Sequence, residues 1–514
     1  MIKNLNKAST FFMVIAFLWA GIYMLCAQLV QWHIATLFKL PALLASKSEI
    51  VYFPGNIIII ILIFIVLYAF KKIKTNISLT MALITLVLFT VVPRYYLLHN
   101  VSIDQTSDYV TYYVNSLSIL ENFNVAPAWQ QYFAAAAANV PIICGIFALG
   151  FKLFGVSPSV ALYMNVFFYS GAVVAIYFIA LRFMSQNTAF MAAAIYALWP
   201  NNISYSVSMS SEPMYIFFLF SGLALFIYGL QTRGIMLFIS MFLSGIVLGL
   251  SQAVRPVTVI FIFSIALVFL FYHNNKTTSD NSYTLKHKLV ILSTLIVAYM
   301  ITLWGLGLYT SRILPTISKP SYGWSLFEGV NINTYGQWDP VSSAIQDSVI
   351  AEYPIEQVQT IFLQMGIDRI KSYNSTQLAN LLAIKTRNIF GNGDYFNRDL
   401  NIYITSQPTM IQSGSVPRSI LAWGDLSFWL YRILAFYFIY ICFKCLYLIL
   451  TKKERKKVNR LFFMILPVCG IMAIHILLTS IERYNYPVIP IMILICMMFS
   501  EKYPYHSIQK RMDR

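Results

Sequence analysis

Residues 77–115 read ISLTMALITLVLFTVVPRYYLLHNVSIDQTSDYVTYYVN, an apolar run followed directly by a polar one. The run 77–98 is long enough to cross a hydrocarbon layer of about 30 Å. Asp104 and Asp108 come next, just beyond the expected membrane edge. Two carboxylates at the mouth of a membrane helix favour a chemical role, and the alternative is that Asp104 caps a helix while Asp108 is a solvated charge.

The composition predicts a membrane protein. Of the 514 residues, 59% are hydrophobic and only 11% are charged, whereas soluble proteins carry about 25% charged residues. No Walker loop or GxGxxG motif opens a helix, which argues against a soluble-type nucleotide site. The six histidines lack metal-ligand spacing, and the six cysteines lie in apolar surroundings that favour core packing over zinc or redox chemistry.

Apolar runs of spanning length recur along the chain and predict an all-α polytopic membrane protein with about twelve transmembrane helices. A further apolar stretch, 137–154, is expected either to span or to lie in the membrane interface. The twelve predicted spans are 9–31, 52–70, 77–98, 158–182, 187–204, 210–229, 235–253, 256–272, 288–311, 426–450, 461–480 and 486–500.

Lysine and arginine predict the orientation. If the N-terminus is cytoplasmic, the inner loops and tail hold 21 of the 36 basic residues against four acids. We therefore expect both termini in the cytoplasm of a cell-membrane protein, with the remaining polar loops outside. The net charge of +17 then reflects membrane orientation, and no nucleic-acid partner is expected.

This topology divides the chain into five parts, two of them extracytoplasmic. The first outer loop holds the Asp pair and surface helices after Pro127 and Pro141, and the second is a long polar segment with an amphipathic stretch around 352–390. The parts are 1–98 (two extra helices and the first core helix), 99–157 (first outer loop), 158–311 (transmembrane core), 312–425 (outer segment) and 426–514 (C-terminal helices and basic tail).

Four more charges are predicted at the same outer level as the Asp pair. Arg94 ends the span before it, Glu212 begins the span 210–229, and Arg255 and Arg483 lie where two spans meet outside. Each alone is explained by snorkelling or structural pairing, but charges at membrane depth tend to mark sites. A lipid-phosphate leaving group needs the cations, and a hydroxyl nucleophile needs a carboxylate base.

The order of these features resembles the GT-C glycosyltransferases, in particular the group around protein O-mannosyltransferases and lipid A aminoarabinose transferase. The resemblance covers roughly 90–500 and rests on loose motifs and their order. The matching pieces are SDYVTYY, FKLFGVSPSVALYMNVFF, ALWPNNISYSVSMSSEPMYIF, AVRPVTVIF, GVNINTYGQWDP and ERYNYPVIP.

The resemblance implies an inverting transfer from a polyprenyl-phosphate sugar to a hydroxyl acceptor, which is a cell-wall polymer, a glycolipid or a protein. Asp108 best matches the catalytic base of this group. Protein mannosyltransferases have an Asp-Glu pair here, where this chain has Ser107-Asp108 with Asp104 one turn earlier, so either Asp remains a candidate base. The implied donor-phosphate ligands are Arg255, Arg483 and Arg94, and the implied substrate contacts are Glu212, Tyr112 and Tyr484.

Other interpretations remain open. A polysaccharide polymerase or ligase also carries a large outer loop with late arginines, a lipid-linked-sugar transporter also has about twelve spans, and a non-catalytic accessory protein is a third. We expect no cofactor, although Asp104, Asp108 and Glu212 offer hard oxygen ligands that suit a divalent cation.

Overall fold

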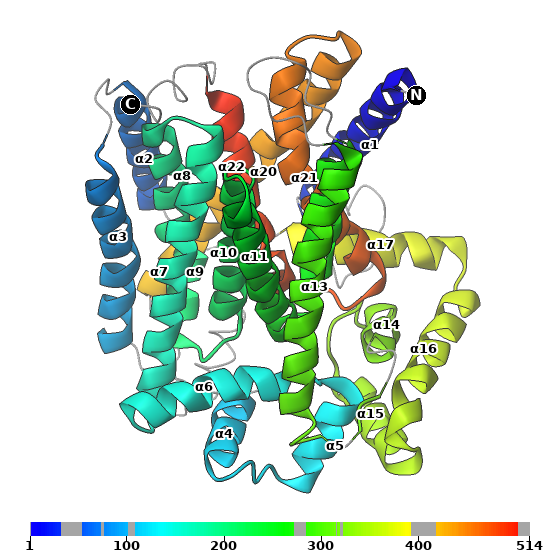
Figure 1. The fold of residues 1–514 in the computed structure, drawn as a ribbon. Helices are drawn as coiled ribbons and strands as arrows, with labels where there is room; N and C mark the ends of the chain where they lie inside the picture. Colours follow the sequence, from blue (N-terminus) through cyan, green and yellow to red (C-terminus); the bar gives the residue numbers. More distant parts are fainter. Residues whose placement is uncertain are drawn as a thin grey trace.

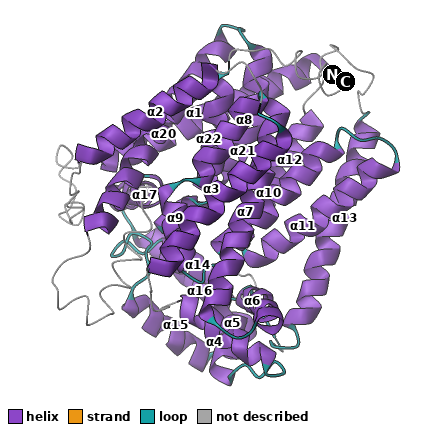
Figure 2. Ribbon diagram, turned by 90° about the vertical axis from the view of Figure 1, so that its left-hand side faces the viewer, coloured by secondary structure: helices purple, strands orange, loops and turns teal. Residues whose placement is uncertain are grey.

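The computed structural model describes residues 2–31, 54–72, 77–100, 108–271, 284–314, 316–318, 322–391 and 418–501. Within these ranges helices are the only regular secondary structure (Figures 1 and 2). The protein is thus an all-α membrane protein, as the apolar runs predict.

Eight of the described helices are long and apolar enough to cross a membrane. They are helical because a segment in lipid must satisfy its backbone hydrogen-bonding groups internally. Their bounds are α1 Ile2–Gln31, α3 Leu79–Asn100, α7 Pro158–Phe183, α10 Glu212–Gly229, α11 Ile235–Val254, α13 Leu285–Thr310, α20 Arg418–Leu450 and α21 Arg455–Leu477.

Four further helices have shorter apolar stretches, of 10–17 described residues. Three of them fall on predicted spans: α2 Pro54–Lys72, α12 Thr258–Phe271 and α22 Val488–Ser500. The predicted span 187–204 is instead broken into α8 Gln186–Ala197, α9 Pro200–Ser204 and the 3₁₀ turn η3 Tyr205–Val207. Pro200 explains the break, because Trp199 before it takes an extended backbone with φ −62° and ψ 121°.

The polar segments gather at one end of the bundle. The pieces after Pro127 and Pro141 are helices, as predicted, and Figure 1 shows α6 lying across the direction of α7. The described helices of the two predicted outer regions are α4 Asp108–Leu120, α5 Pro127–Ala136, α6 Val140–Phe154, α14 Gly323–Gly329, α15 Pro340–Glu352, α16 Ile355–Ser372 and α17 Ser375–Phe390. Both ribbon views place α4, α5, α6, α14, α15 and α16 toward this same end. The 3₁₀ turn η4 Glu482–Asn485 lies between α21 and α22.

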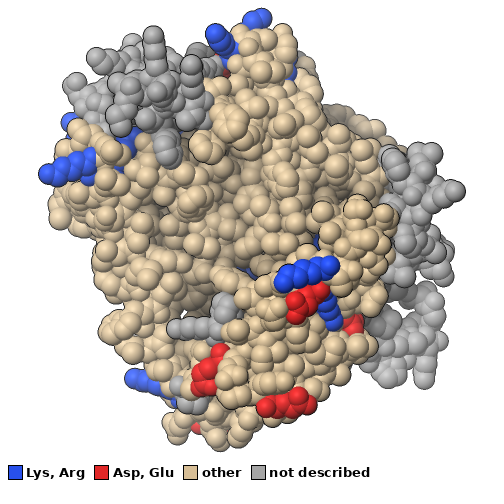
Figure 3. Space-filling model, turned by 90° about the vertical axis from the view of Figure 1, so that its right-hand side faces the viewer, with Lys and Arg blue, Asp and Glu red and all other residues tan. Residues whose placement is uncertain are grey.

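Charge is distributed unevenly between the two ends. On the face shown in Figure 3, acidic side chains gather toward the end formed by the polar helices, with basic ones among them, and the opposite end shows mainly basic side chains. This is the separation on which the predicted orientation rests.

Glycines allow two membrane helices to approach closely. Gly245 and Gly249 of α11 face α13, and a Cβ atom at Gly245 would lie 2.3 Å from the carbonyl oxygen of Leu295. Small residues four apart are a common means of packing helices in lipid, where hydrophobic burial contributes little to association.

Gly245→Ala is expected to destabilise the protein by about 1–3 kcal/mol, because the added methyl forces α11 and α13 apart. Thermal unfolding in detergent measures the effect. Gly305→Ala on α13 is the matched control, since a Cβ there meets no atom within 4 Å, and it should leave the melting temperature unchanged or slightly higher. Equal melting temperatures for the two variants would contradict this packing.

Candidate active site

The site is built where helices begin, end or turn. Asp108 is the first residue of α4, and Arg483 lies in η4 between α21 and α22. Although they are far apart in sequence, Arg483 Nη2 donates to Asp108 Oδ2 at 2.7 Å. This charge-assisted bond joins the first predicted outer loop to the last membrane hairpin.

A second ion pair lies beside the first. Glu212 is the first residue of α10, with Pro213 in the first turn, and Arg255 follows the last residue of α11. Arg255 Nη2 pairs with Glu212 Oε1 and also donates to the hydroxyl of Ser211 at 3.3 Å. Arg483 Nε approaches Glu212 Oε1 at 4.0 Å, so the two pairs form one network of two cations and two carboxylates.

The network is balanced in charge but incomplete in hydrogen bonding. Glu212 Oε2, Arg255 Nε and Arg483 Nε are buried atoms without a hydrogen-bond partner in the described part of the chain. The side chains of Arg255 and Arg483 are 18% and 19% exposed, and that of Asp108 is 43% exposed. Part of each guanidinium side chain is therefore accessible to an anionic ligand, whereas the two Nε atoms are not.

The two predicted substrate-contacting tyrosines lie against the network. Tyr112 is one turn after Asp108 on α4, and burial followed by the charge of Asp108 raises the pKa of its phenol. The ring of Tyr484 lies 5.9 Å from the Arg255 guanidinium and stacks at 5.1 Å on the ring of His475.

The Asp108 carboxylate is held in its charged form. Partial burial acts to raise its pKa, but the charge and hydrogen bond of Arg483, with the charge of Arg255, outweigh burial and hold the pKa below its usual value. Asp108 is therefore ionised and ready to accept a proton near neutral pH, although its driving force for doing so is small.

The structure does not bring Arg94 into the network. Arg94 has no exposed surface, and its Nη1 donates to the carbonyl oxygens of Thr90 at 2.9 Å and Ala197 at 3.0 Å. The guanidinium lies 4.5 Å above the ring of Tyr169. This placement gives it a packing role among α3, α7 and α8, so we omit it from the phosphate site proposed below. Asp104, the other candidate base, lies outside the described residues.

One functional candidate was missed by sequence reasoning. Glu328, near the end of α14, is buried, and burial followed by the charge of Asp339 raises its pKa to about 7. It stands in the apolar run WSLF followed by EG, which is a signal that could have found it. A metal site of three or more His, Cys, Asp or Glu side chains is not found among the residues that the structure describes.

Glu212→Gln is expected to lower the unfolding free energy by about 2 kcal/mol, because it leaves two arginines adjacent without their shared carboxylate. Glu212 is only 1% exposed, so solvent does not compensate. Thermal unfolding in detergent checks this, with Glu352→Gln as the control because Glu352 is an exposed acid on α15. An unchanged melting temperature for Glu212→Gln would show that the pair contributes no stability.

Neither a known protein-family pattern nor a curated protein sequence matches the chain. Among solved structures, the chain is similar to the Archaeoglobus fulgidus oligosaccharyltransferase in its apo form, with TM-score 0.46, 14% identity, and coverage of 84% of this chain and 52% of that one. It is also similar to the archaeal oligosaccharyltransferase from the same organism in complex with an inhibitory peptide and a dolichol-phosphate, with TM-score 0.44, 13% identity, and coverage of 81% and 49%. The chain spans about half the length of these proteins.

Proposed function

We propose that the chain is a GT-C-type glycosyltransferase that moves a sugar from a polyprenyl-phosphate carrier to a hydroxyl acceptor. The observation that carries the proposal is the network of Asp108, Arg483, Glu212 and Arg255, which lie where helices begin, end or turn. It combines an ionised, partly exposed carboxylate with two partly exposed cations. Such a combination serves one proton acceptor and one anionic leaving group.

In the proposed reaction, the acceptor hydroxyl gives its proton to Asp108 as its oxygen attacks the anomeric carbon of the donor sugar. The bond from that carbon to the phosphate oxygen breaks, and its electron pair stays on the phosphate. In-line attack inverts the anomeric configuration. The polyprenyl phosphate leaves with one more negative charge than the donor carried, and Arg255 and Arg483 stabilise that charge.

Arg483 links the uptake of the proton by Asp108 to the departure of the lipid phosphate. It is paired with Asp108 before the reaction, at 2.7 Å. When Asp108 takes up the proton it loses its charge, and Arg483 becomes available to the phosphate at the moment when the phosphate gains charge. Arg483 thus stabilises the Asp108 carboxylate before the transfer and the lipid phosphate after it. At neither stage is a charge left unpaired in this partly buried site.

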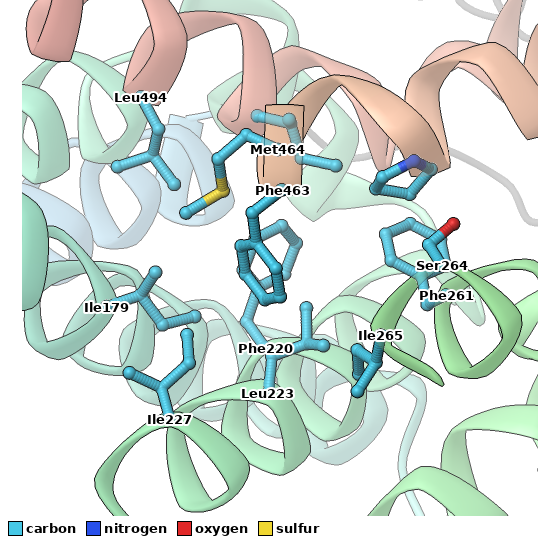
Figure 4. A pocket seen from close by; sticks show the side chains of 12 residues that line it. Ile179, Phe220, Leu223, Ile227, Phe261, Ser264, Ile265, Phe463, Met464 and Leu494 are labelled. Carbon is cyan, nitrogen blue, oxygen red and sulfur yellow. The ribbon is translucent and has the colours of Figure 1, made fainter. Parts of the chain in front are cut away.

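A small apolar hollow lies deeper in the bundle, among α7, α10, α12, α21 and α22 (Figure 4). None of its lining residues is charged, and its volume is about 20 Å³. This is about the space that one water molecule needs, so the hollow is too small for the hydrocarbon tail of the donor.

We further propose that the network faces the extracytoplasmic side and that the basic end faces the cytoplasm. The excess of lysine and arginine in the loops of the opposite end supports this orientation. A donor flipped to the outer leaflet would then meet its acceptor outside the cell, where nucleotide sugars are absent.

The proposal is tested by supplying purified protein in lipid with three radiolabelled donors of one sugar: a polyprenyl monophosphate, a polyprenyl diphosphate and a nucleotide derivative. Cell-envelope extract supplies acceptors, and the assay follows release of lipid phosphate together with label in the acceptor. Consumption of the monophosphate donor with inversion at the anomeric carbon is expected. Use of the nucleotide sugar alone, or of no donor across several sugars, would refute the proposed function.

A further inference from the structure

Arg483 lies in a loop, residues 478–487, that connects α21 to α22 and is called the Arg483 loop below. Its regular structure is the 3₁₀ turn η4, in which Tyr484 N donates to the carbonyl oxygen of Ile481 at 3.0 Å. An isolated 3₁₀ turn has poor hydrogen-bond geometry and is weak by itself. The position of the Arg483 guanidinium therefore depends on the segments that hold this loop.

Helix α17 holds the Arg483 loop on both sides of Arg483. Lys385 Nζ donates to the carbonyl oxygen of Leu478 at 2.7 Å, at the start of the loop. Asn485 Nδ2, two residues after Arg483, donates to the carbonyl oxygen of Ile389 at 2.7 Å. Residues four apart, such as Lys385 and Ile389, are neighbours on one side of a helix. One side of α17 therefore contacts both ends of the loop.

The outer segment holds the loop at a third point, Ser480. Its backbone N donates to the carbonyl oxygen of Gly336 at 2.8 Å, and its Oγ donates to that of Tyr335 at 2.8 Å. Gly336 has φ 79° and Tyr335 has φ 53°, a left-handed backbone that is uncommon and unfavourable for tyrosine. Such a conformation persists only where surrounding contacts impose it, so this turn and the loop fix each other.

Lys385 is buried among backbone carbonyl groups. It is 1% exposed, and it forms no ion pair with any acid in the described part of the chain. Its Nζ donates to the carbonyl oxygens of Leu478, the C-cap of α21, and of Gly329, the last residue of α14. Helix C-termini carry unpaired carbonyl groups and partial negative charge, which favour a cation. The amine thus links two helix ends, which an apolar side chain of similar size could not do.

The two helix ends that Lys385 links are in direct contact. A Cβ atom at Gly329 would lie 2.3 Å from the backbone of Leu478. Burial lowers the pKa of the Lys385 amine to about 7, but a neutral amine still has two N–H donors, one for each carbonyl oxygen. Both hydrogen bonds are therefore available whether the amine is charged or neutral.

We propose that Lys385 is a positioning residue for Arg483 and acts by fixing the Arg483 loop against α14 and α17. The inference rests on the proposed glycosyltransferase function. In the loop as it is held, Arg483 Nη2 lies 2.7 Å from Asp108 Oδ2 and Arg483 Nε lies 4.0 Å from Glu212 Oε1. Lys385 acts through the backbone of the loop, and we assign it no contact with the substrate. The outer segment is then part of the apparatus that stabilises the departing phosphate.

The test is transfer from a radiolabelled polyprenyl-phosphate sugar by Lys385→Met in lipid. Methionine is flexible and fills a similar space without N–H donors. We expect kcat to fall about 10- to 100-fold, because a misplacement of about 1 Å has costs of that size. The KM for the donor should rise several-fold, because Arg483 no longer meets the phosphate. A merely structural role would reduce the fraction of active protein and leave this KM unchanged.

Lys371→Met is the matched control for Lys385→Met. Lys371 is an exposed lysine in the last turn of α16, and its replacement should leave both kcat and KM as in the wild type. Values for Lys385→Met equal to those of this control would refute the proposal.

The dependence on Arg483 is tested by adding Lys385→Met to Arg483→Gln. If Lys385 acts through Arg483, the second change should lower transfer by less than about threefold, because the two residues are not independent. A loss as large as that caused by Lys385→Met in the wild-type background would show that Lys385 acts elsewhere, and the proposal would be wrong.

Hydrogen exchange tests the placement of the loop without any assay of transfer. Backbone amides of the Arg483 loop are expected to exchange several-fold faster in Lys385→Met than in Lys371→Met. Asn485→Ala keeps the lysine and removes the bond to Ile389, so it should show a smaller change of the same kind even if Lys385→Met does not fold. Unchanged exchange in Asn485→Ala and in folded Lys385→Met would refute the positioning role. Absence of donor use by the wild type would refute the proposed function instead, whatever the exchange rates.

Discussion

Asp108→Asn is expected to lower transfer by about 10²- to 10⁴-fold, which is the usual contribution of a positioned general base. Asparagine keeps the size of the side chain and can still meet Arg483 through its amide oxygen. It cannot take up the acceptor proton, so the hydroxyl must attack with its proton in place. The measurement is single-turnover transfer from a polyprenyl-phosphate sugar at saturating donor, which isolates the chemical step from binding.

Asp368→Asn is the matched control for this variant. Asp368 is an exposed acid on α16 whose Oδ1 accepts from Gln364 Nε2 at 2.9 Å, and its replacement should leave transfer unchanged. Both variants should insert and melt like the wild type. Full activity of Asp108→Asn would move the base to another carboxylate, with Asp104 and Glu212 as the remaining sequence candidates.

Arg483→Gln is expected to lower kcat/KM by about 10³-fold, in the range found when one preorganised charge stabiliser is removed. Arg483 pairs with Asp108 at 2.7 Å and approaches Glu212 at 4.0 Å, so its loss affects the base and the leaving group together. Arg483→Lys should recover part of the activity, because it restores the charge but not the planar donor geometry.

The effect of Arg483→Gln on pH dependence has a defined sign. Arg483 lowers the pKa of Asp108, so removing the cation lets that pKa rise and the residual activity shifts toward higher pH. In the double variant with Asp108→Asn, the loss should be far smaller than the product of the single losses, because the two residues act as one unit. Independent, multiplicative losses would show that they work separately.

Arg312→Gln serves as the control for Arg483→Gln. Arg312 is an exposed arginine just after α13, and its replacement removes the same charge without touching the network. Transfer by Arg483→Gln within threefold of this control would contradict the assignment of Arg483 to the donor phosphate.

Much of the fold follows from the sequence because lipid imposes simple rules on it. Long apolar runs must become helices in a bilayer, and all but one of the predicted spans are single helices. The exception, 187–204, carries Pro200, whose effect on the preceding backbone ends α8. Proline is tolerated inside α3 and α21, so its presence alone does not decide where a span breaks.

The sequence predicts the level of the charged residues relative to the membrane, but not which neighbour each side chain faces. Hydropathy places Arg94 at the same level as Arg255, but the face that a helix turns toward its neighbours depends on packing, and Arg94 points into the contact with Tyr169. Glu328 follows the short run WSLF, but its burial results from contacts of α14 with α16 and α21. Long-range packing of this kind leaves no local periodicity to detect.

The bond between Arg483 and Asp108 also has a consequence for biosynthesis. The two residues are 375 positions apart, and at about 5–20 residues per second a ribosome takes roughly 20 to 75 s to travel from one to the other. During that time the nascent chain carries Asp108 without its cation and has no complete phosphate site. The protein is therefore expected to remain inert toward lipid donors until its last helical hairpin is inserted, so partly made chains cannot attach sugar at the site of insertion.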